Sequence, residues 1–399
     1  MFSLYFTDWY SKGVPIANGQ AILDSLSDKI YRTNTGKKPI GKHFFNKSEF
    51  EQMCRISGNK YTYVDTFVDN FIFLIGYELD TPGGKNRDYK HWENLLVPLS
   101  SILTTKIITA INNKGYLVFT DNEGWLQMPD ILRKQAISLG VDPNKIIYIT
   151  ADPTSNNLRD IYWNYQEEYC FCKVIEENKY PTVKGITNIK PTVLFTSLVG
   201  TANPSKIEFL NKIIDNNLFM DGKISLIKVK YIYKKLLNND LLKKYPIIID
   251  SSLDYFPKFT NTLTLGASSY INIVHSSDNQ YEPYLPSIVV SNNDLFTSVI
   301  CKRPFITVCY SKNKLEYIKQ LGYKTFNNYF NENYDNIEDK HHRIDTIINL
   351  LKDLKTTDLD KLLLSMQDTL DYNFNHFFRK TNRSSHIAVK KLNEIINAD

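Results

Sequence analysis

The chain has 399 residues, of which 42% are hydrophobic and 23% charged, with a formal net charge of +5 at pH 7. The composition is typical of a globular protein, and the length suits about two domains. No segment approaches the roughly 18 consecutive apolar residues of a membrane span. The first residues also lack the basic and apolar regions of a signal peptide. A cytoplasmic protein without a membrane partner is therefore expected.

In the first half of the chain, apolar runs alternate with helix-like segments and polar loops. We expect strands at residues 2–6, 71–75, 116–120 and 145–150, and helices that end at 112 and span 128–140. Residues 161–190 are expected to be irregular. Strands separated by helices, with polar loops at their carboxyl ends, predict a Rossmann-like domain over residues 1–185.

The second half repeats this alternation. We expect strands at 192–197, 270–274, 287–290 and 304–309, and helices at 207–216, 294–300, 313–321 and 343–354. Such an order predicts a second parallel sheet and an α/β fold of two Rossmann-like domains. The second domain is predicted over residues 186–355, with a helical C-terminal tail at 356–399.

Neither a metal site nor a dinucleotide or phosphate-loop motif is expected. Cys170 and Cys172 are separated by one residue, which is not a zinc-site spacing. The five cysteines are scattered, as in a protein with reduced, buried thiols. Neither GxGxxG nor GxxxxGK[ST] is present. The sequence therefore predicts no metal and no required cofactor.

Residues 302–343 carry a dense pattern: PFI at 304–306, LGYKTF at 321–326, YD at 334–335 and IED at 337–339, followed by Arg343. This segment resembles the C-terminal half of a family of virus-encoded, glycosyltransferase-like proteins with a GT-B type fold. The resemblance implies two Rossmann-like domains facing a cleft and a tail that packs back on the N-terminal domain. Where the family carries TET and TEK, this chain has HSS at 275–277 and NND at 292–294.

The resemblance also implies a reaction. It implies transfer of a sugar from a nucleotide sugar, a UDP-sugar in the first instance, to a hydroxyl acceptor, in the host cytoplasm if the protein is phage-encoded. By analogy with this family, and with a mildly basic, phage-like composition, the resemblance implies hydroxymethylcytosine in duplex DNA as the acceptor. The alternatives are a surface-polysaccharide or protein glycosyltransferase and a catalytically degenerate nucleotide- or sugar-binding protein.

Candidate catalytic residues follow strand 116–120. A sugar transfer that inverts the anomeric centre needs a base for the acceptor proton, and Asp121 and Glu123 are the predicted candidates. Turn or helix capping is their alternative role.

Candidate donor-binding residues follow three of the expected strands of the second half. A diphosphate needs backbone N–H groups at a helix N-terminus or a cation. The candidates are Gly200, Lys206, His275, Ser276, Ser277, Asn293 and Asp294. The alternatives are a plain strand-end residue for His275 and helix capping for Asn293 and Asp294.

Candidate acceptor-binding residues lie in residues 84–92, where cations and rings alternate. Such a mixture suits phosphates and bases, and it predicts DNA contacts from Lys85, Arg87, Lys90, His91 and Trp92. Residues 228–235 have a similar pattern. For both segments, the alternative is a solvated edge strand protected by lysines.

Overall fold

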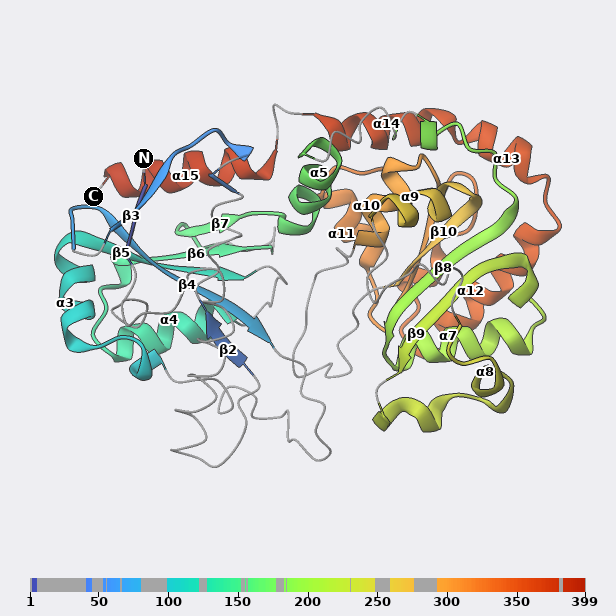
Figure 1. The fold of residues 1–399 in the computed structure, drawn as a ribbon, viewed down its shortest axis with the longest axis horizontal. Helices are drawn as coiled ribbons and strands as arrows, with labels where there is room; N and C mark the ends of the chain where they lie inside the picture. Colours follow the sequence, from blue (N-terminus) through green and yellow to red (C-terminus); the bar gives the residue numbers. More distant parts are fainter. Residues whose placement is uncertain are drawn as a thin grey trace. The chain divides into compact units, whose positions relative to one another are not determined.

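The computed structural model describes residues 2–5, 41–44, 53–54, 56–64, 67–79, 99–121, 128–151, 155, 157–176, 183, 185–229, 231–247, 259–275, 293–379 and 383–398. The chain forms two compact units, and it passes from the first to the second after Glu168, within a helix. After residue 380 it returns to the first unit. Each unit has a largely parallel sheet with helices packed against it, so the fold class is α/β (Figure 1).

The first unit is built on a seven-stranded sheet with the order β3-β1-β4-β5-β6-β7, and its neighbours along this path are parallel. One further strand, β2, pairs antiparallel with β4. The strands are β1 (Phe2–Tyr5), β2 (Gly41–Phe44), β3 (Tyr61–Val64), β4 (Phe71–Leu79), β5 (Gly115–Asp121), β6 (Ile146–Thr150) and β7 (Asp160–Tyr162).

Alternating side chains of the central strands fill two separate cores. In β4, Phe71 and Phe73 pack in one core, and Ile72 and Leu74 pack in the other. The same alternation continues in β5 and β6, as expected of a parallel sheet that is buried on both faces. The first core is covered by α3 (Thr105–Lys114) and α4 (Met128–Ser138), and Leu99 of the 3-10 turn Leu99–Ser101 also packs in it. A second 3-10 turn, Pro143–Lys145, directly precedes β6.

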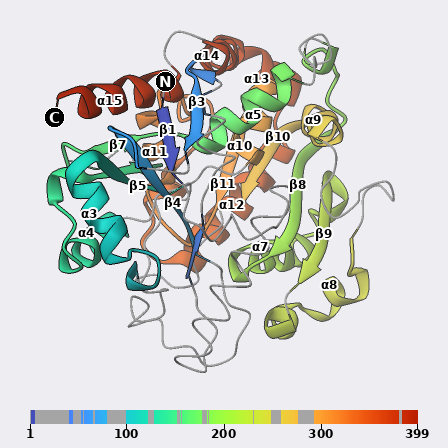
Figure 2. The ribbon, with the colours of Figure 1, turned by 60° about the vertical axis from the view of Figure 1, so that its left-hand side comes forward.

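The second core of this unit is covered by a helix from the far end of the sequence. Helix α15 (Ser384–Ala398) contributes Ala388, Val389 and Leu392 to it and runs along the sheet in Figures 1 and 2. Buried Glu168 holds its start, because this carboxylate accepts hydrogen bonds from the hydroxyl of Ser384 and the backbone N–H of Ser385. Arg383 pairs with the same carboxylate at 3.0 Å.

The second unit has a four-stranded, fully parallel sheet with the order β11-β10-β8-β9. Its strands are β8 (Val193–Ala202), β9 (Gly222–Val229), β10 (Ser269–His275) and β11 (Phe305–Val308). Helices α9 (Phe259–Ala267) and α10 (Asn293–Ile300) pack on one face, while α7 (Pro204–Asp215) and α12 (Lys340–Lys355) pack on the other (Figure 1).

The remaining elements of the second unit are short or lie outside these layers. Helix α14 packs against α10. The set comprises α5 (Tyr165–Glu176), which begins in the first unit, the 3-10 helices η5 (Phe219–Asp221), η6 (Tyr231–Leu236) and η7 (Asn333–Asn336), and the α-helices α8 (Asn239–Lys244), α11 (Lys314–Gln320), α13 (Leu359–Ser365) and α14 (Gln367–Phe378).

The α/β class and most described elements agree with the sequence-based expectation, but residues 161–190 do not. They were expected to be irregular, and they contain the last residues of β7 and the whole of α5. Of the tail predicted at 356–399, α13 and α14 lie in the second unit and α15 in the first. No helix in the described ranges is long and apolar enough to cross a bilayer.

Candidate functional site

The carboxyl edge of the second sheet is where its strand order reverses. The chain goes from β8 to β9 on one side and then crosses to β10 on the other side of β8. In open α/β sheets, ligands bind outside the carboxyl ends of the strands at such a reversal. The reversal between β8 and β10 therefore marks the candidate site.

At this carboxyl edge, strand β8 leads directly into helix α7. Asn203 is the N-cap of α7, and its side-chain oxygen accepts from the backbone N–H of Lys206 at 3.0 Å and the hydroxyl of Ser205 at 2.9 Å. Lys206 thus lies in the first turn of the helix. Gly200 was expected in a turn, but it lies inside β8, because the strand continues to Ala202.

A buried histidine and serine join β10 to β8 beside this helix. His275, the last residue of β10, is fully buried, and its Nε2 lies 2.7 Å from the hydroxyl oxygen of Ser197 in β8. The ring of Phe209 in α7 meets the imidazole edge-on at a centroid distance of 5.5 Å. Burial, and then the charge of Lys206, lower the pKa of His275 well below its usual range. The imidazole is consequently neutral at pH 7.

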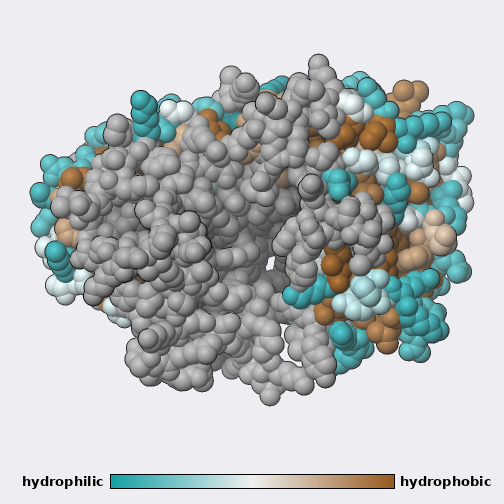
Figure 3. Space-filling model, in the orientation of Figure 1, coloured by the Kyte–Doolittle hydropathy of each residue, from teal (hydrophilic) through white to brown (hydrophobic). Residues whose placement is uncertain are grey.

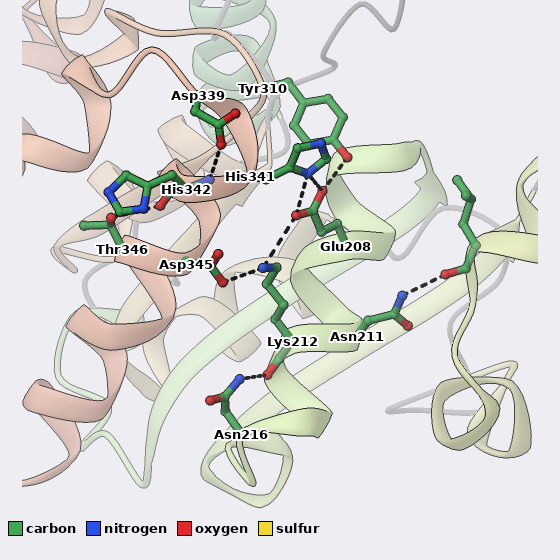
Figure 4. Close-up of polar contacts among 11 residues, drawn as sticks. Glu208, Asn211, Lys212, Asn216, Tyr310, Asp339, His341, His342, Asp345 and Thr346 are labelled. Carbon is green, nitrogen blue, oxygen red and sulfur yellow. Dashed lines mark hydrogen bonds and ion pairs between the residues drawn. The ribbon is translucent and has the colours of Figure 1, made fainter.

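A polar network lies further along α7, where this helix meets α12 and the exit of β11 (Figure 4). The carboxylate of Glu208 accepts from the hydroxyl of Tyr310 at 2.6 Å and lies 2.8 Å from Nδ1 of His341. Lys212 lies 3.8 Å from the same carboxylate and pairs with Asp345. The imidazole of His341 is 57% exposed, whereas Glu208 is only 17% exposed. The network therefore presents a histidine whose ring orientation is fixed by a carboxylate.

The backbone that carries Tyr310 is held by Arg343. This buried guanidinium donates to the carbonyl oxygens of Cys309, Tyr310 and Ile337. Since Arg343 lies on α12 and Cys309 directly follows β11, the start of α12 is fixed at the carboxyl edge of the sheet.

Of the other predicted donor-binding residues, two lie within the described residues and two do not. Asn293 and Asp294 are the first two residues of α10. The last turn of α10 leads through Arg303 into the beginning of β11, so its first turn points toward the carboxyl edge. Ser276 and Ser277 lie outside the described residues.

In the first unit, the predicted catalytic and DNA-binding residues are mostly beyond the described part of the chain. Asp121 is the last residue of β5 and pairs with Thr150 of β6, so its backbone lies at the carboxyl edge of the first sheet. The others lie outside the described ranges, and their assigned roles stay predictions. They are Glu123, Lys85, Arg87, Lys90, His91 and Trp92.

Sequence reasoning did not find the network of Figure 4. Glu208 and His341 are separated by 133 positions, and no local motif connects them. The available signals were the spacing of Glu208 and Lys212 by one helical turn, and the run Lys340-His341-His342 directly after the N-cap Asp339. Neither signal indicates that the two helices meet.

Comparisons with known proteins give no family for this chain. No protein-family model matches it, and no curated protein matches it. Among solved structures, one match is a variant of the wall teichoic acid polymerase TagF, at 11% identity, covering 96% of each chain, with a TM-score of 0.26. At that TM-score the similarity carries no argument about fold or activity.

Proposed function

We propose that the chain is a glycosyltransferase of GT-B type, whose second unit binds the nucleotide diphosphate of a sugar donor. The observation that carries the proposal is the reversal of strand order between β8 and β10, with the first turn of α7 beside it. Backbone N–H groups at such a turn favour phosphate oxygens. Lys206, in that turn, supplies a positive charge.

The proposed catalytic residues belong to the first unit. Asp121 and Glu123, at and after the carboxyl end of β5, are the proposed proton acceptors for the sugar-accepting hydroxyl. The proposed acceptor is hydroxymethylcytosine in duplex DNA, with residues 84–92 as its contact. To reach a base inside a duplex, an enzyme flips the nucleotide out at a cost of a few kcal/mol, which backbone contacts must offset.

The experiment measures binding of UDP, with a matched pair of lysine variants. Lys206→Ala should weaken UDP binding by about 1.5–3 kcal/mol in isothermal titration calorimetry, because a hydrogen bond to a charged group is lost. Lys352→Ala removes an exposed lysine from the last turns of α12, at the opposite end of that helix from His341, and should leave the affinity unchanged. Equal affinities for both variants would remove Lys206 from the site.

The acceptor is tested by transfer. The protein is incubated with UDP-sugars and either hydroxymethylcytosine DNA or unmodified DNA, and the bases are weighed after digestion. A sugar-sized mass gain on hydroxymethylcytosine alone supports the proposal. UDP binding without any mass gain on DNA would exclude this acceptor and favour a polysaccharide or protein acceptor. Absence of UDP binding would overturn the transferase proposal itself.

A further inference from the structure

Two short helices at the edge of the second unit expose leucines between lysine pairs. Helices η6 and α8 carry the sequence KKLLNNDLLKK over residues 234–244. In each leucine pair one side chain is inside and the other outside. Leu237 and Leu241 are buried, whereas Leu236 is 40% and Leu242 is 50% exposed. Hydrophobic and hydrophilic residues are interspersed on the described face of Figure 3.

The two lysine pairs lie close together although they belong to different helices. Lys234 Nζ is 5.8 Å from the ring centroid of Tyr245, the residue that follows Lys244. Lys244 itself lies over the ring of Phe219, next to the exposed Met220. We name the set Lys234, Lys235, Leu236, Leu242, Lys243 and Lys244 the lysine–leucine surface.

This surface is held rigidly on α7. The side-chain amide of Asn211 in α7 donates to the carbonyl oxygen of Leu236 at 2.7 Å, and its oxygen accepts from the backbone N–H of Asn238 at 3.0 Å. Asn238 then caps α8 through the N–H of Leu241. The exposed leucines are consequently presented by fixed backbone, beside the edge strand β9.

The charges of this surface favour an anionic partner. Among residues 231–247, four of the lysines are exposed, and the only described carboxylate is Asp240, which pairs with Lys243 at 3.0 Å. A second carboxylate lies beside this segment, since Asp215 of α7 accepts from the side-chain amide of Asn238 at 2.8 Å. The four exposed lysines still outnumber these two carboxylates, and the surface keeps a net positive charge.

The exposed aliphatic side chains favour an anionic lipid surface over nucleic acid as the partner. A phosphate backbone of nucleic acid would use the lysines but gain little from Leu236, Leu242 and Met220. Stacking on bases would need exposed rings. Tyr233 of η6 is buried, and the half-buried ring of Tyr245 lies under Lys234. Aliphatic side chains flanked by lysines are the combination that inserts at the boundary between lipid headgroups and acyl chains.

We propose that the lysine–leucine surface docks the second unit onto an anionic lipid bilayer, with the leucines at the acyl boundary and the lysines on lipid phosphates. This contact is with the membrane surface and does not involve a membrane span. It does not rest on the proposed sugar transfer.

Vesicle co-sedimentation tests the docking. The full chain should bind vesicles of phosphatidylcholine and phosphatidylserine at about seven to three, and not vesicles of phosphatidylcholine alone, because each lysine adds roughly fivefold to the partition coefficient at an anionic surface. The double variant Leu236→Ser/Leu242→Ser should lose at least tenfold in binding. Leu364→Ser, which changes a 74% exposed leucine on α13 of the same unit, should bind like the original chain.

A fluorescent probe separates insertion from simple charge attraction. The native cysteines are all buried, so Met220→Cys can be labelled with a polarity-sensitive dye, with Leu364→Cys as the matched control. A blue shift with anionic vesicles at position 220 and none at position 364 supports insertion. Absence of vesicle binding overturns the proposal. It is also overturned if the dye does not shift and duplex DNA displaces the vesicles, because the surface would then be a nucleic-acid site.

Discussion

His275 is a histidine that the fold keeps neutral. Its ring is buried between Ser197 and Phe209, and both burial and the charge of Lys206 lower its pKa. In the unfolded chain the same side chain would take up a proton below about pH 6.5. Folding therefore becomes less favourable as the pH falls below that value, by as much as about 1.4 kcal/mol per pH unit down to the folded pKa.

This effect can be isolated by substitution. His275→Gln removes the titrating group, so the free energy of unfolding should fall less between pH 7.5 and 5.5 than it does for the original chain, as measured by urea unfolding. His342→Gln, which changes an exposed histidine on α12, serves as the matched control. Parallel pH dependences for His275→Gln and the original chain would show that folding does not shift the pKa of His275.

The residue scale is also where sequence reasoning reached its limit. His275 was predicted as a donor-binding residue, with a plain strand-end role as the alternative, and its partner Ser197 lies in a strand 78 positions earlier. Glu208 and His341 were missed for the same reason, since their contact depends on the packing of α7 against α12. A contact between separate elements leaves no periodic signal in either of them.

At the scale of elements, the segment that carries the family resemblance is largely a scaffold. Phe305 and Ile306 form the start of β11, and Gly322, with a φ of +87°, ends α11. Buried Glu332 accepts from the backbone N–H of Phe326 at 2.8 Å. Asp339 caps α12 by accepting from the N–H of His342. Apart from the two strand residues, these groups order the segment between α11 and the start of α12.

Asp335 is the cap of α11. Its carboxylate accepts from the backbone N–H groups of Lys314 and Leu315 at 3.0 and 2.9 Å, in place of the N-cap Asn313, whose side chain makes no capping bond. Burial raises the pKa of Asp335. The helix start therefore depends on a residue that lies 20 positions after it.

Removing this cap should destabilise the second unit. Asp335→Ala is expected to cost about 1–3 kcal/mol in urea unfolding, because two buried N–H groups lose their acceptor, and amide exchange in α11 should accelerate. Asp335→Asn keeps one acceptor oxygen and should cost less. Asp353→Ala, at an exposed position of α12, serves as control. If Asp335→Ala and Asp353→Ala cost the same, another group supports the start of α11.

Elements with strong local patterns were predictable, and those shaped by their neighbours were not. Strands β5, β6 and β10 are short apolar runs bounded by polar turns, and they lie close to their expected positions. Strand β8 extends past Gly200, because Thr201 and Ala202 pair with Lys228 and Val229 of β9. Helix α5 was missed because its cysteines and aromatic residues are weak helix formers.

At the scale of the whole molecule, the first unit depends on α15. The buried pair of Glu168 and Arg383, with the hydrogen bonds to Ser384 and Ser385, fixes the start of that helix. Further along, the hydroxyl of Tyr116 donates to the carbonyl oxygen of Ile396 at 3.3 Å. The described unit is therefore completed by residues more than 200 positions apart.

Breaking this anchor should loosen α15. Glu168→Gln leaves Arg383 buried beside a neutral amide, which is expected to cost about 3–5 kcal/mol. Hydrogen–deuterium exchange should rise throughout residues 384–398 and along the β4 face that α15 covers. Glu394→Gln, which removes an exposed partner of Lys390, should change stability by less than about 0.5 kcal/mol. Unaltered exchange in α15 of Glu168→Gln would mean that its apolar contacts alone hold it.

The position of α15 in the sequence also affects how the protein is made. When the ribosome has completed the first sheet, the face formed by Ile72, Leu74 and Val118 still lacks the part of its cover that α15 supplies. At about 5–20 residues per second, synthesis from β7 to the end of α15 takes roughly 12–50 s. During that interval an apolar sheet face is open on the nascent chain, while the elements of the second unit emerge. The first unit begins translation first and completes its fold last, and its uncovered face is a natural substrate for chaperones.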